Sequence, residues 1–366
     1  MLVINHTDMT NASNDFIDTE PVSSLHPVIF VLMWINVLIT SGGNLLTIII
    51  FLRDKSINHK PANLFILNLA IADLKIGLVS LPWFNLWWHY GDWIFGEKLC
   101  KFWVIVDFTA CTESMIAMLL IGWDRLWMVR NIQSYVQNQT RRKTVTIILL
   151  SWLLCYAHYF ALILLWEPVS NEWNIDYTID CDFPPNYSLK YTIYEVVSQF
   201  SLPMLALAYF NIGVFVIISK RAKRIQPSEP MSTQDTLVGT CNENRTQRNQ
   251  VFSIHQPNRR TTQDPSANPA TANIDPPSQS SGRQRKDRKA AFTLTLLVVT
   301  YAICWFPYNV VIVLETLSED NVATWVASFT EYLLWLNSAV NPFLYVATNR
   351  QFRNHLKRTF HCETAT

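Results

Sequence analysis

The stretch TVTIILLSWLLCYAHYFALILLW, from Thr144 to Trp166, contains no Lys, Arg, Asp or Glu. It is long enough to cross a bilayer, because a spanning helix needs roughly 20 mostly apolar residues. Six other stretches share this character, and they gather much of the hydrophobic half of the 366-residue chain. We therefore predict an all-α membrane protein, a bundle of seven transmembrane helices at 27–52, 62–88, 99–129, 144–166, 191–219, 290–316 and 325–348.

The distribution of charge predicts how this bundle is oriented. The formal net charge is only +1, from 29 Lys and Arg against 28 Asp and Glu. Basic residues nevertheless occupy the loops and tail on the side opposite the N-terminus, apart from Lys75, Lys98, Lys101 and Lys190. Positively charged loops stay in the cytoplasm, so the N-terminus is expected outside the cell and the C-terminus inside. The expected location is the plasma membrane, which the chain crosses several times.

The spans divide the chain into five parts. These are an extracellular tail (1–26), the first five spans with their loops (27–219), a third cytoplasmic loop (220–289), the last two spans (290–348), and a short amphipathic inner-surface helix with a cytoplasmic tail (349–366). The third loop is rich in Pro, Ser, Thr, Asn and Gln in its middle, which predicts disorder. Its basic ends predict contacts with lipid headgroups and docking of a cytosolic partner.

Three residues outside the spans are predicted modification sites. Asn5 and Asn11 each begin an Asn-X-Ser/Thr sequon in the extracellular tail, where glycosylation is expected. Cys362 follows the amphipathic stretch Arg350–Phe360 and is expected to carry palmitate.

Polar and kinking residues recur inside the spans, where burial is costly unless they face the bundle or a watery cavity. In chain order they are Asn44, Leu69-Ala-Ile-Ala-Asp73, Asp124-Arg125, Trp152, Pro203, Cys304-Trp-Phe-Pro307 and Asn341-Pro-Phe-Leu-Tyr345. This ordered set resembles the rhodopsin-like G-protein-coupled receptors, and the resemblance covers all seven spans. It implies a receptor rather than an enzyme, with a heterotrimeric G protein, arrestin, receptor kinases and membrane lipids as partners, and no nucleic acid.

A narrower resemblance concerns the ligand. Asp107 with Trp305, Tyr308 and Trp335 is similar to the ligand cage of biogenic-amine receptors. The segments 107–114 and 333–342 look most like the Gi-coupled histamine receptors, with the muscarinic acetylcholine receptors next. The implied ligand is a small cationic amine of the histamine kind, and the implied G protein is of the Gi/o class. Acetylcholine, another monoamine and a trace amine remain alternatives.

The residues around Asp107 support this interpretation physically. An unpaired carboxylate inside a membrane is costly, and the outer halves of the other spans contain no Arg that would pair with it. A ligand ammonium is the better partner. Aromatic side chains offer their ring faces to the same cation, or else simply pack together; they are Phe108, Trp305, Tyr308, Tyr332 and Trp335.

The far end of the ligand is expected to point toward the fifth span. Cys111 continues the helical stripe of Asp107 four residues on, and Glu195, Ser198 and Gln199 face it from the fifth span. A single serine there disfavours a catechol. Gln199 aligns with the glutamate of the Gi-coupled histamine receptors, and Glu195 lies one turn outward. Either residue is expected to receive the polar tail, unless Glu195 is exposed to water.

The family resemblance also implies a disulfide, a switch and an ion site. Cys100 and Cys181 would join the second outer loop to the third span. Asp124 would pair with Arg125 at rest, and Arg125 would then engage the G protein while the switch residues Trp305, Pro307, Asn341, Pro342 and Tyr345 rearrange. No resident cofactor is expected. A sodium ion, or else a water network, is expected at Asp73, Ser114, Asn337, Ser338 and Asn341.

Some residues depart from the family pattern. Leu126 replaces the tyrosine that usually follows Asp-Arg, and Asn211 stands where many members have a tyrosine. Lys75 is an unusual charge two residues after Asp73, and it is expected to point away from that carboxylate toward a neighbouring span. A transporter remains a remote alternative, although the two halves of the chain show no internal repeat.

Overall fold

The computed structural model describes residues 27–170, 175–177, 179–183, 185, 188–225, 277–317, 322–348 and 352–354. The predicted glycosylation sites Asn5 and Asn11 and the predicted palmitoylation site Cys362 lie outside these residues, as does the middle of the third cytoplasmic loop.

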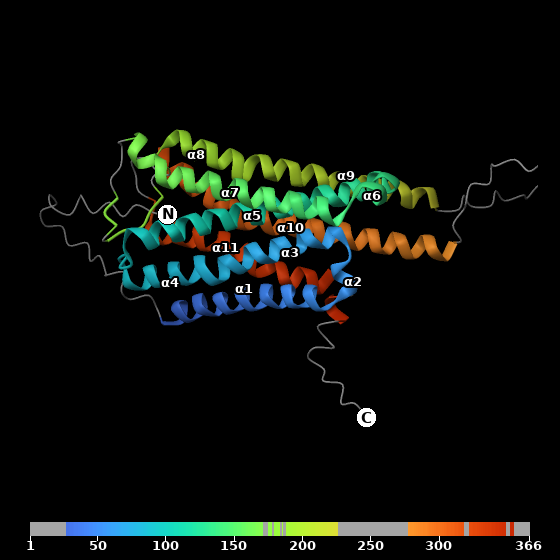
Figure 1. The fold of residues 1–366 in the computed structure, drawn as a ribbon, viewed down its shortest axis with the longest axis horizontal. Helices are drawn as coiled ribbons and strands as arrows, with labels where there is room; N and C mark the ends of the chain where they lie inside the picture. The colour runs from blue at the N-terminus through green and yellow to red at the C-terminus, as the bar shows by residue number, and fades with distance from the viewer. Residues whose placement is uncertain are drawn as a thin grey trace, which may run out of the picture.

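Long helices lying side by side form an elongated bundle (Figure 1). Five of them cross the bundle as single helices: α1 (Pro27–Arg53), α5 (Gly96–Arg130), α7 (Arg141–Ser170), α10 (Pro277–Leu317) and α11 (Thr324–Thr348). Two crossings are composite, each with a π-helical segment. They are α3 (Pro61–Lys75), η3 (Ile76–Ser80) and α4 (Leu81–Tyr90), and then α8 (Leu189–Glu195), η5 (Val196–Ser201) and α9 (Leu202–Ile225). No strand occurs among the described residues, so the predicted all-α class is confirmed.

The two π-helical segments lie next to prolines. Pro82 is the second residue of α4, which follows η3, and Pro203 is the second residue of α9, which follows η5. Proline has no backbone N–H and its ring crowds the carbonyl of the preceding turn, so a wider turn relieves the clash. The hydropathy pattern predicted one continuous span in each case, because a π-turn leaves the apolar composition unchanged.

Two short helices, α2 (Lys55–Asn58) and α6 (Ile132–Asn138), lie at the inner end of the bundle (Figure 1). Helix α9 continues to Ile225 and α10 begins at Pro277, so both helices extend into the segment 220–289 that was predicted as the third cytoplasmic loop. A helix that leaves the membrane no longer needs apolar residues, so hydropathy marks only its buried part. The described residues 352–354 of the predicted inner-surface helix are helical, and Phe352 is buried against Tyr345.

Six of the described spans, composite ones included, are long and apolar enough to cross a membrane. The remaining crossing helix, α11, carries polar residues along its length, among them Glu331, Asn337, Ser338 and Asn341. All four are buried, and α11 packs against α10, α1 and α3. The polar residues of α11 are therefore directed into the bundle, where the functional groups gather.

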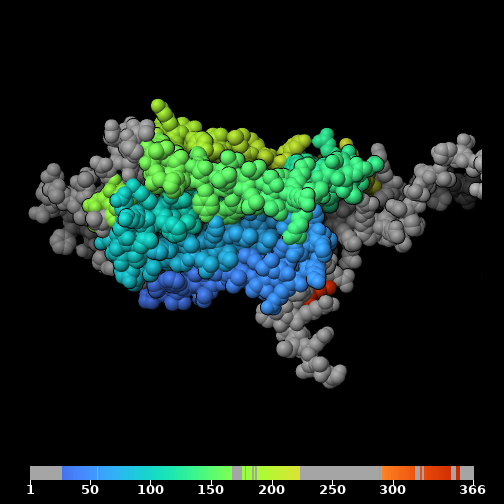
Figure 2. Space-filling model, viewed as in Figure 1, coloured from blue at the N-terminus to red at the C-terminus, as the bar shows by residue number. Residues whose placement is uncertain are grey.

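The third span, α5, is the centre of the packing. It contacts α3, α7 and α9, and it buries a nearly continuous series of side chains. Helix α7 lies over it on the face seen in Figure 2, with exposed leucines such as Leu149, Leu153 and Leu154 directed outward. Such exposed apolar side chains suit lipid as the surrounding solvent. Helix α1 approaches α11 closely, since a Cβ on Gly43 would lie 3.0 Å from Pro342 Cγ.

Candidate ligand and switch sites

A cavity near the outer end of the bundle brings together most of the predicted ligand residues. The space between its atoms is about 450 Å³, open solvent included. Twelve residues line it: Asp107, Phe108, Cys111, Thr112, Tyr159, Glu195, Gln199, Trp305, Tyr308, Glu331, Leu334 and Trp335.

A tryptophan on α11 donates a hydrogen bond to the carboxylate of Asp107. The indole Nε1 of Trp335 donates to Asp107 Oδ1 at 3.0 Å, and Cys111 Sγ lies 3.9 Å from the same oxygen. Trp335 is itself locked by an edge-to-face contact with Phe84, with ring centroids 4.8 Å apart. This arrangement holds the carboxylate at the cavity wall and leaves it room for a charged partner.

Two predicted ligand residues do not line the cavity. The Tyr332 hydroxyl donates to the Met33 carbonyl at 3.2 Å and accepts from Asn36 at 3.1 Å, so this ring is turned toward α1. The Ser198 hydroxyl is buried and lies outside the cavity lining. Tyr332 was predicted as one of the aromatic residues near Asp107, and Ser198 as a polar residue of the fifth span, where it lies within the π-helical segment η5.

Four lining residues were missing from the sequence prediction: Thr112, Tyr159, Glu331 and Leu334. Glu331 lies one helical turn before Trp335, and that spacing was sufficient to predict it. Tyr159 carries no comparable signal, because it is one of several aromatic residues in a uniformly apolar span. Only the packing of α7 against α5 brings Tyr159 to the cavity.

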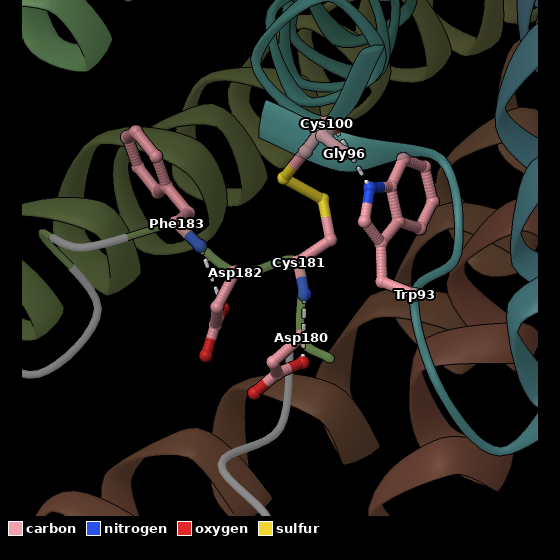
Figure 3. Close-up of a disulfide and its surroundings, with 7 residues drawn as sticks. All are labelled: Trp93, Gly96, Cys100, Asp180, Cys181, Asp182 and Phe183. Atoms are coloured by element: carbon pink, nitrogen blue, oxygen red, sulfur yellow. Dashed lines mark hydrogen bonds between the residues drawn. A yellow bond between two sulfur atoms is a disulfide. The ribbon is translucent and has the colours of Figure 1, made fainter. Parts of the chain in front are cut away.

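A disulfide joins the second outer loop to α5 (Figure 3). Cys100 at the start of α5 is bonded to Cys181, with the two Cα atoms 5.5 Å apart, so the predicted pairing is confirmed. Phe183, two residues further on, is fully buried and its ring lies 4.5 Å from that of Phe108. Because Phe108 lines the cavity, the disulfide positions part of the loop against the cavity wall.

A second polar cluster lies deeper, between α3, α5 and α11. Asp73 Oδ1 accepts from Ser114 at 2.9 Å and from Ser338 at 2.8 Å, and Asp73 Oδ2 accepts from Asn341 at 2.8 Å. Asn337 is also buried, although its side-chain oxygen has no hydrogen-bond partner in the described structure. Four of the five residues predicted for the ion site are therefore connected by hydrogen bonds: Asp73, Ser114, Ser338 and Asn341.

A third polar cluster occupies the opposite side of α5, between α3 and α7. Glu113 Oε1 accepts from Asn68 at 3.1 Å and from Ser151 at 2.5 Å. Asn68 in turn accepts from the Trp152 indole at 2.7 Å. The sequence analysis did not predict a role for Glu113, which adjoins Ser114 but faces the other side of the helix.

Lys75 borders this third cluster. Its ammonium donates to the Tyr156 hydroxyl at 2.6 Å and lies 3.9 Å from the centre of the Trp152 ring. The expectation that Lys75 reaches a neighbouring span is therefore confirmed. Aromatic faces and a hydroxyl on α7 stabilise the charge at a depth where lipid cannot.

At the inner end, Asp124 is hydrogen-bonded to the second inner loop. Its Oδ1 accepts from the Tyr135 hydroxyl and from Gln139 Nε2, each at 3.0 Å. Burial and the nearby Asp124 raise the pKa of Tyr135, which keeps its hydroxyl a donor. The described residues show no ion pair between Asp124 and Arg125, so the resting pair expected from the resemblance is not formed here. Adjacent helical residues point in different directions, which leaves Asp124 facing α6.

Leu126 and Asn211, the two residues at the inner end that depart from the family pattern, both have structural roles. Leu126 packs in a buried apolar cluster with Val129, Val214 and Leu294, and its methyl group occupies the space where a Cβ on Gly213 would lie. Asn211 accepts a hydrogen bond from the Thr295 hydroxyl at 3.1 Å, which joins α9 to α10. Both residues therefore contribute to the contact between helices at the inner end.

The bundle, the disulfide-tied outer loop and the polar clusters define a class of membrane receptor. Residues 43–345 match the family described as 7 transmembrane receptor (rhodopsin family), and the chain belongs to this family of receptors, which are not enzymes. The resemblance stated from the motifs is confirmed.

Particular members of the family are similar over most of their length. The chain is 31% identical to the histamine H4 receptor of Mus musculus over 345 residues, covering 85% of this chain and 86% of the relative. It is 26% identical to the 5-hydroxytryptamine receptor 1B of Mus musculus over 337 residues, covering 88% and 83%. It is also 24% identical to a probable G-protein coupled receptor, No18, of Amphibalanus amphitrite, covering 89% and 88%.

Proposed function

We propose that the protein is a cell-surface receptor for a small cationic amine of the histamine kind, with Asp107 as the partner of the ligand ammonium. The observation that carries the proposal is the position of Asp107 in an aromatic-walled cavity with no Lys, Arg or His among the described residues that line it. Phe108, Trp305, Tyr308 and Trp335 line the same cavity and offer faces for a cation. The names of the similar receptors support an amine ligand.

A ligand panel tests this function. Cells that express the receptor would be exposed to histamine, serotonin, acetylcholine, other monoamines and trace amines while cAMP and calcium are recorded. At least one amine is expected to act, and Asp107→Asn is expected to lower its potency by 10-fold or more, since a charge-assisted bond contributes about 1.5–3 kcal/mol. Asp92→Asn, an exposed change in the first outer loop, is the matched control. A response that survives Asp107→Asn unchanged would refute the aminergic assignment.

The proposed effector is a heterotrimeric Gi/o protein, which Arg125 would engage. Arg125 lies on the same helix as Asp107 and is displaced roughly 27 Å along it, from a rise of about 1.5 Å per residue. The ligand and effector sites are therefore separate, and coupling between them requires two bundle states. Pro307 and Pro342, which lie inside α10 and α11, and the buried Tyr345 are the proposed moving parts. Nucleotide exchange on purified Gi, Gs and Gq proteins distinguishes the classes.

Sodium is the proposed allosteric ligand of the cluster around Asp73. The chemistry of the residues fits: one carboxylate and several hydroxyl and amide oxygens suit a small hard cation. The buried side-chain oxygens of Asn337 and Asn341 have no hydrogen-bond partner among the described residues. Bound sodium would supply a positive charge against Asp73, with Ser114 and Ser338 completing the set. Replacing NaCl by choline chloride is expected to raise agonist affinity, and Asp73→Asn is expected to abolish this effect.

Arrestin and receptor kinases are the further proposed partners, acting on the cytoplasmic face.

The proposed orientation places the N-terminus outside the plasma membrane, which follows from the basic inner loops. Glycosidase treatment of intact cells tests Asn5 and Asn11, and metabolic labelling with palmitate tests Cys362.

A further inference from the structure

Lys75 lies at mid-depth in its span and at the surface of the bundle. It is the fifteenth of the 30 residues of the crossing Pro61–Tyr90, and its side chain is only partly buried. Ile71 and Leu78, about one turn before and after it on the same stripe of the helix, are exposed. The second span therefore carries a cation on a surface that otherwise suits lipid.

The adjoining surface of α7 has the same character. Leu149 and Leu153 are exposed there, and they share a helical stripe with Tyr156, whose hydroxyl accepts the hydrogen bond from Lys75. Tyr156 is the sixteenth of the 26 residues of Arg141–Trp166, so α7 also places the ammonium near mid-depth. We call the surface around this contact the α3–α7 face; its residues are Ile71, Lys75, Leu78, Leu149, Leu153 and Tyr156.

The contacts within the protein satisfy this ammonium only in part. An ammonium has three N–H donors, and the bond to Tyr156 is the only hydrogen bond of Lys75 among the described residues. The rings of Trp152 and Tyr156 have their centres 3.9 and 4.9 Å from Lys75 Nζ and add cation–π attraction. Neither ring supplies a negative charge, so the face still offers two donors and a net positive charge to an acceptor.

Glu113 does not supply the missing charge by direct contact. It belongs to the neighbouring polar cluster, where its Oε1 accepts from Asn68 and from Ser151, and its Oε2 accepts from the Cys155 thiol at 3.6 Å. No ion pair joins Glu113 to Lys75 in the described part of the chain. Neutral donors therefore occupy the buried carboxylate, and the ammonium at the surface keeps its capacity for an outside partner.

The depth of Lys75 decides what kind of acceptor can reach it. The hydrocarbon core is about 30 Å thick, so the charged groups of lipids lie about 15 Å or more from its middle. A lysine side chain, with four carbons and bonds of about 1.5 Å, extends about 6 Å and does not reach a headgroup from there. An acceptor at mid-depth has to be carried on another membrane-spanning helix, because ionisable groups inside a membrane pair with one another.

We propose that the α3–α7 face docks a transmembrane helix of another membrane protein, and that this helix carries an Asp or Glu at the middle of its span to pair with Lys75. The basis is charge complementarity at matched depth. The Tyr156 hydroxyl accepts from Lys75 and keeps its own proton, which it donates to the second oxygen of the same carboxyl group. A second copy of this chain does not fit, because a symmetric contact through this face would bring two Lys75 ammonium groups together.

A designed single-span helix tests the docking. The probe is a poly-leucine helix of about 20 residues with one Glu at its midpoint. Two comparison helices carry Leu at the midpoint, or carry the Glu near one end. Energy transfer between the labelled helix and the full-length receptor is measured in phosphatidylcholine bilayers. The central-Glu helix is expected to associate about 3-fold to 20-fold more tightly than the all-leucine helix, the range for one interhelical side-chain bond in a membrane. Moving the Glu to one end is expected to remove this preference.

Receptor variants assign the effect to Lys75. Lys75→Met keeps an unbranched side chain without the charge, and it is expected to abolish the preference for the central Glu. Lys75→Arg keeps the charge and is expected to retain the preference. Lys190→Met removes an exposed cation at the start of α8 and is the matched control, which is expected to leave the preference unchanged.

Three results would overturn the proposal. The first is equal association of the central-Glu and all-leucine helices with the unaltered receptor, a comparison that needs no variant to fold. The second is a preference that survives Lys75→Met, or that Lys190→Met reduces equally. The third is displacement of the central-Glu helix by oleate but not by oleyl alcohol, which would show that a lipid carboxylate reaches Lys75. None of these measurements involves the amine ligand, so the proposed receptor function is tested separately.

Discussion

The cluster around Glu113 makes a sharp prediction about stability. Glu113→Ala removes the acceptor of two strong interhelical bonds, from Asn68 on α3 and from Ser151 on α7, and of a weak one from the Cys155 thiol on α7. Interhelical side-chain bonds in membranes contribute on average about 0.6 kcal/mol and at most about 1.7 kcal/mol. Both bonds are expected at the upper end of that range, because the acceptor is a carboxylate and one bond is only 2.5 Å long. The expected loss is therefore about 2–3 kcal/mol.

The assay is thermal unfolding of the purified receptor in detergent, together with a double-mutant cycle. Glu113→Ala and Asn68→Ala would be measured singly and combined, and the coupling free energy is expected to be about 0.6–1.7 kcal/mol. Glu97→Ala is the matched control on the same helix. Its carboxylate makes a 2.8 Å ion pair with Lys101 but the side chain is 58% exposed, so solvent screens the pair and the melting temperature is expected to stay close to that of the unaltered receptor. Equal effects of the two alanine substitutions, or zero coupling with Asn68, would refute the reasoning.

Three further predictions concern the outer cavity, the disulfide and the inner loop. Trp335→Phe removes the indole bond to Asp107 and is expected to lower amine potency by about 5-fold to 10-fold, corresponding to about 1 kcal/mol; unchanged potency in a dose–response assay would contradict it. Loss of the disulfide by Cys181→Ser opens a link across 81 residues and is expected to cost about 4 kcal/mol, seen as reduced surface expression; normal expression and melting would contradict it. Tyr135→Phe removes one of the two hydrogen-bond donors to Asp124 and is expected to raise basal signalling. Unaltered basal nucleotide exchange would contradict this prediction.

The sequence predicted the fold well because a bilayer imposes one dominant requirement. Apolar runs such as 144–166 have to be helical, since lipid cannot satisfy backbone hydrogen bonds. Hydropathy marks only the part of a helix that crosses the membrane. Helix α10 therefore begins at Pro277, before the predicted span 290–316, in a segment predicted to be cytoplasmic where hydropathy carries no information.

The candidate site was predicted in part for a similar reason. Asp107 and Glu195 were found because a carboxylate in an apolar span needs an explanation, and both line the cavity. Tyr159 was missed and Tyr332 was placed in the ligand site, because an aromatic residue in a span gives no indication of the direction in which it points. The structure turns Tyr332 toward Asn36 and Tyr159 toward Gln199.

The amino-acid sequence by itself determined the seven-span helical class, the expected orientation and the residues whose polarity requires burial within the bundle. Only the tertiary structure decided which of these residues meet. Ser114 contacts Asp73 while the adjacent Glu113 contacts Asn68 and Ser151, so neighbours in sequence belong to different clusters on opposite sides of α5. The physical reason is that hydropathy and charge are properties of single residues, whereas hydrogen-bond partners depend on how each helix is rotated and on the π-turns that alter that rotation.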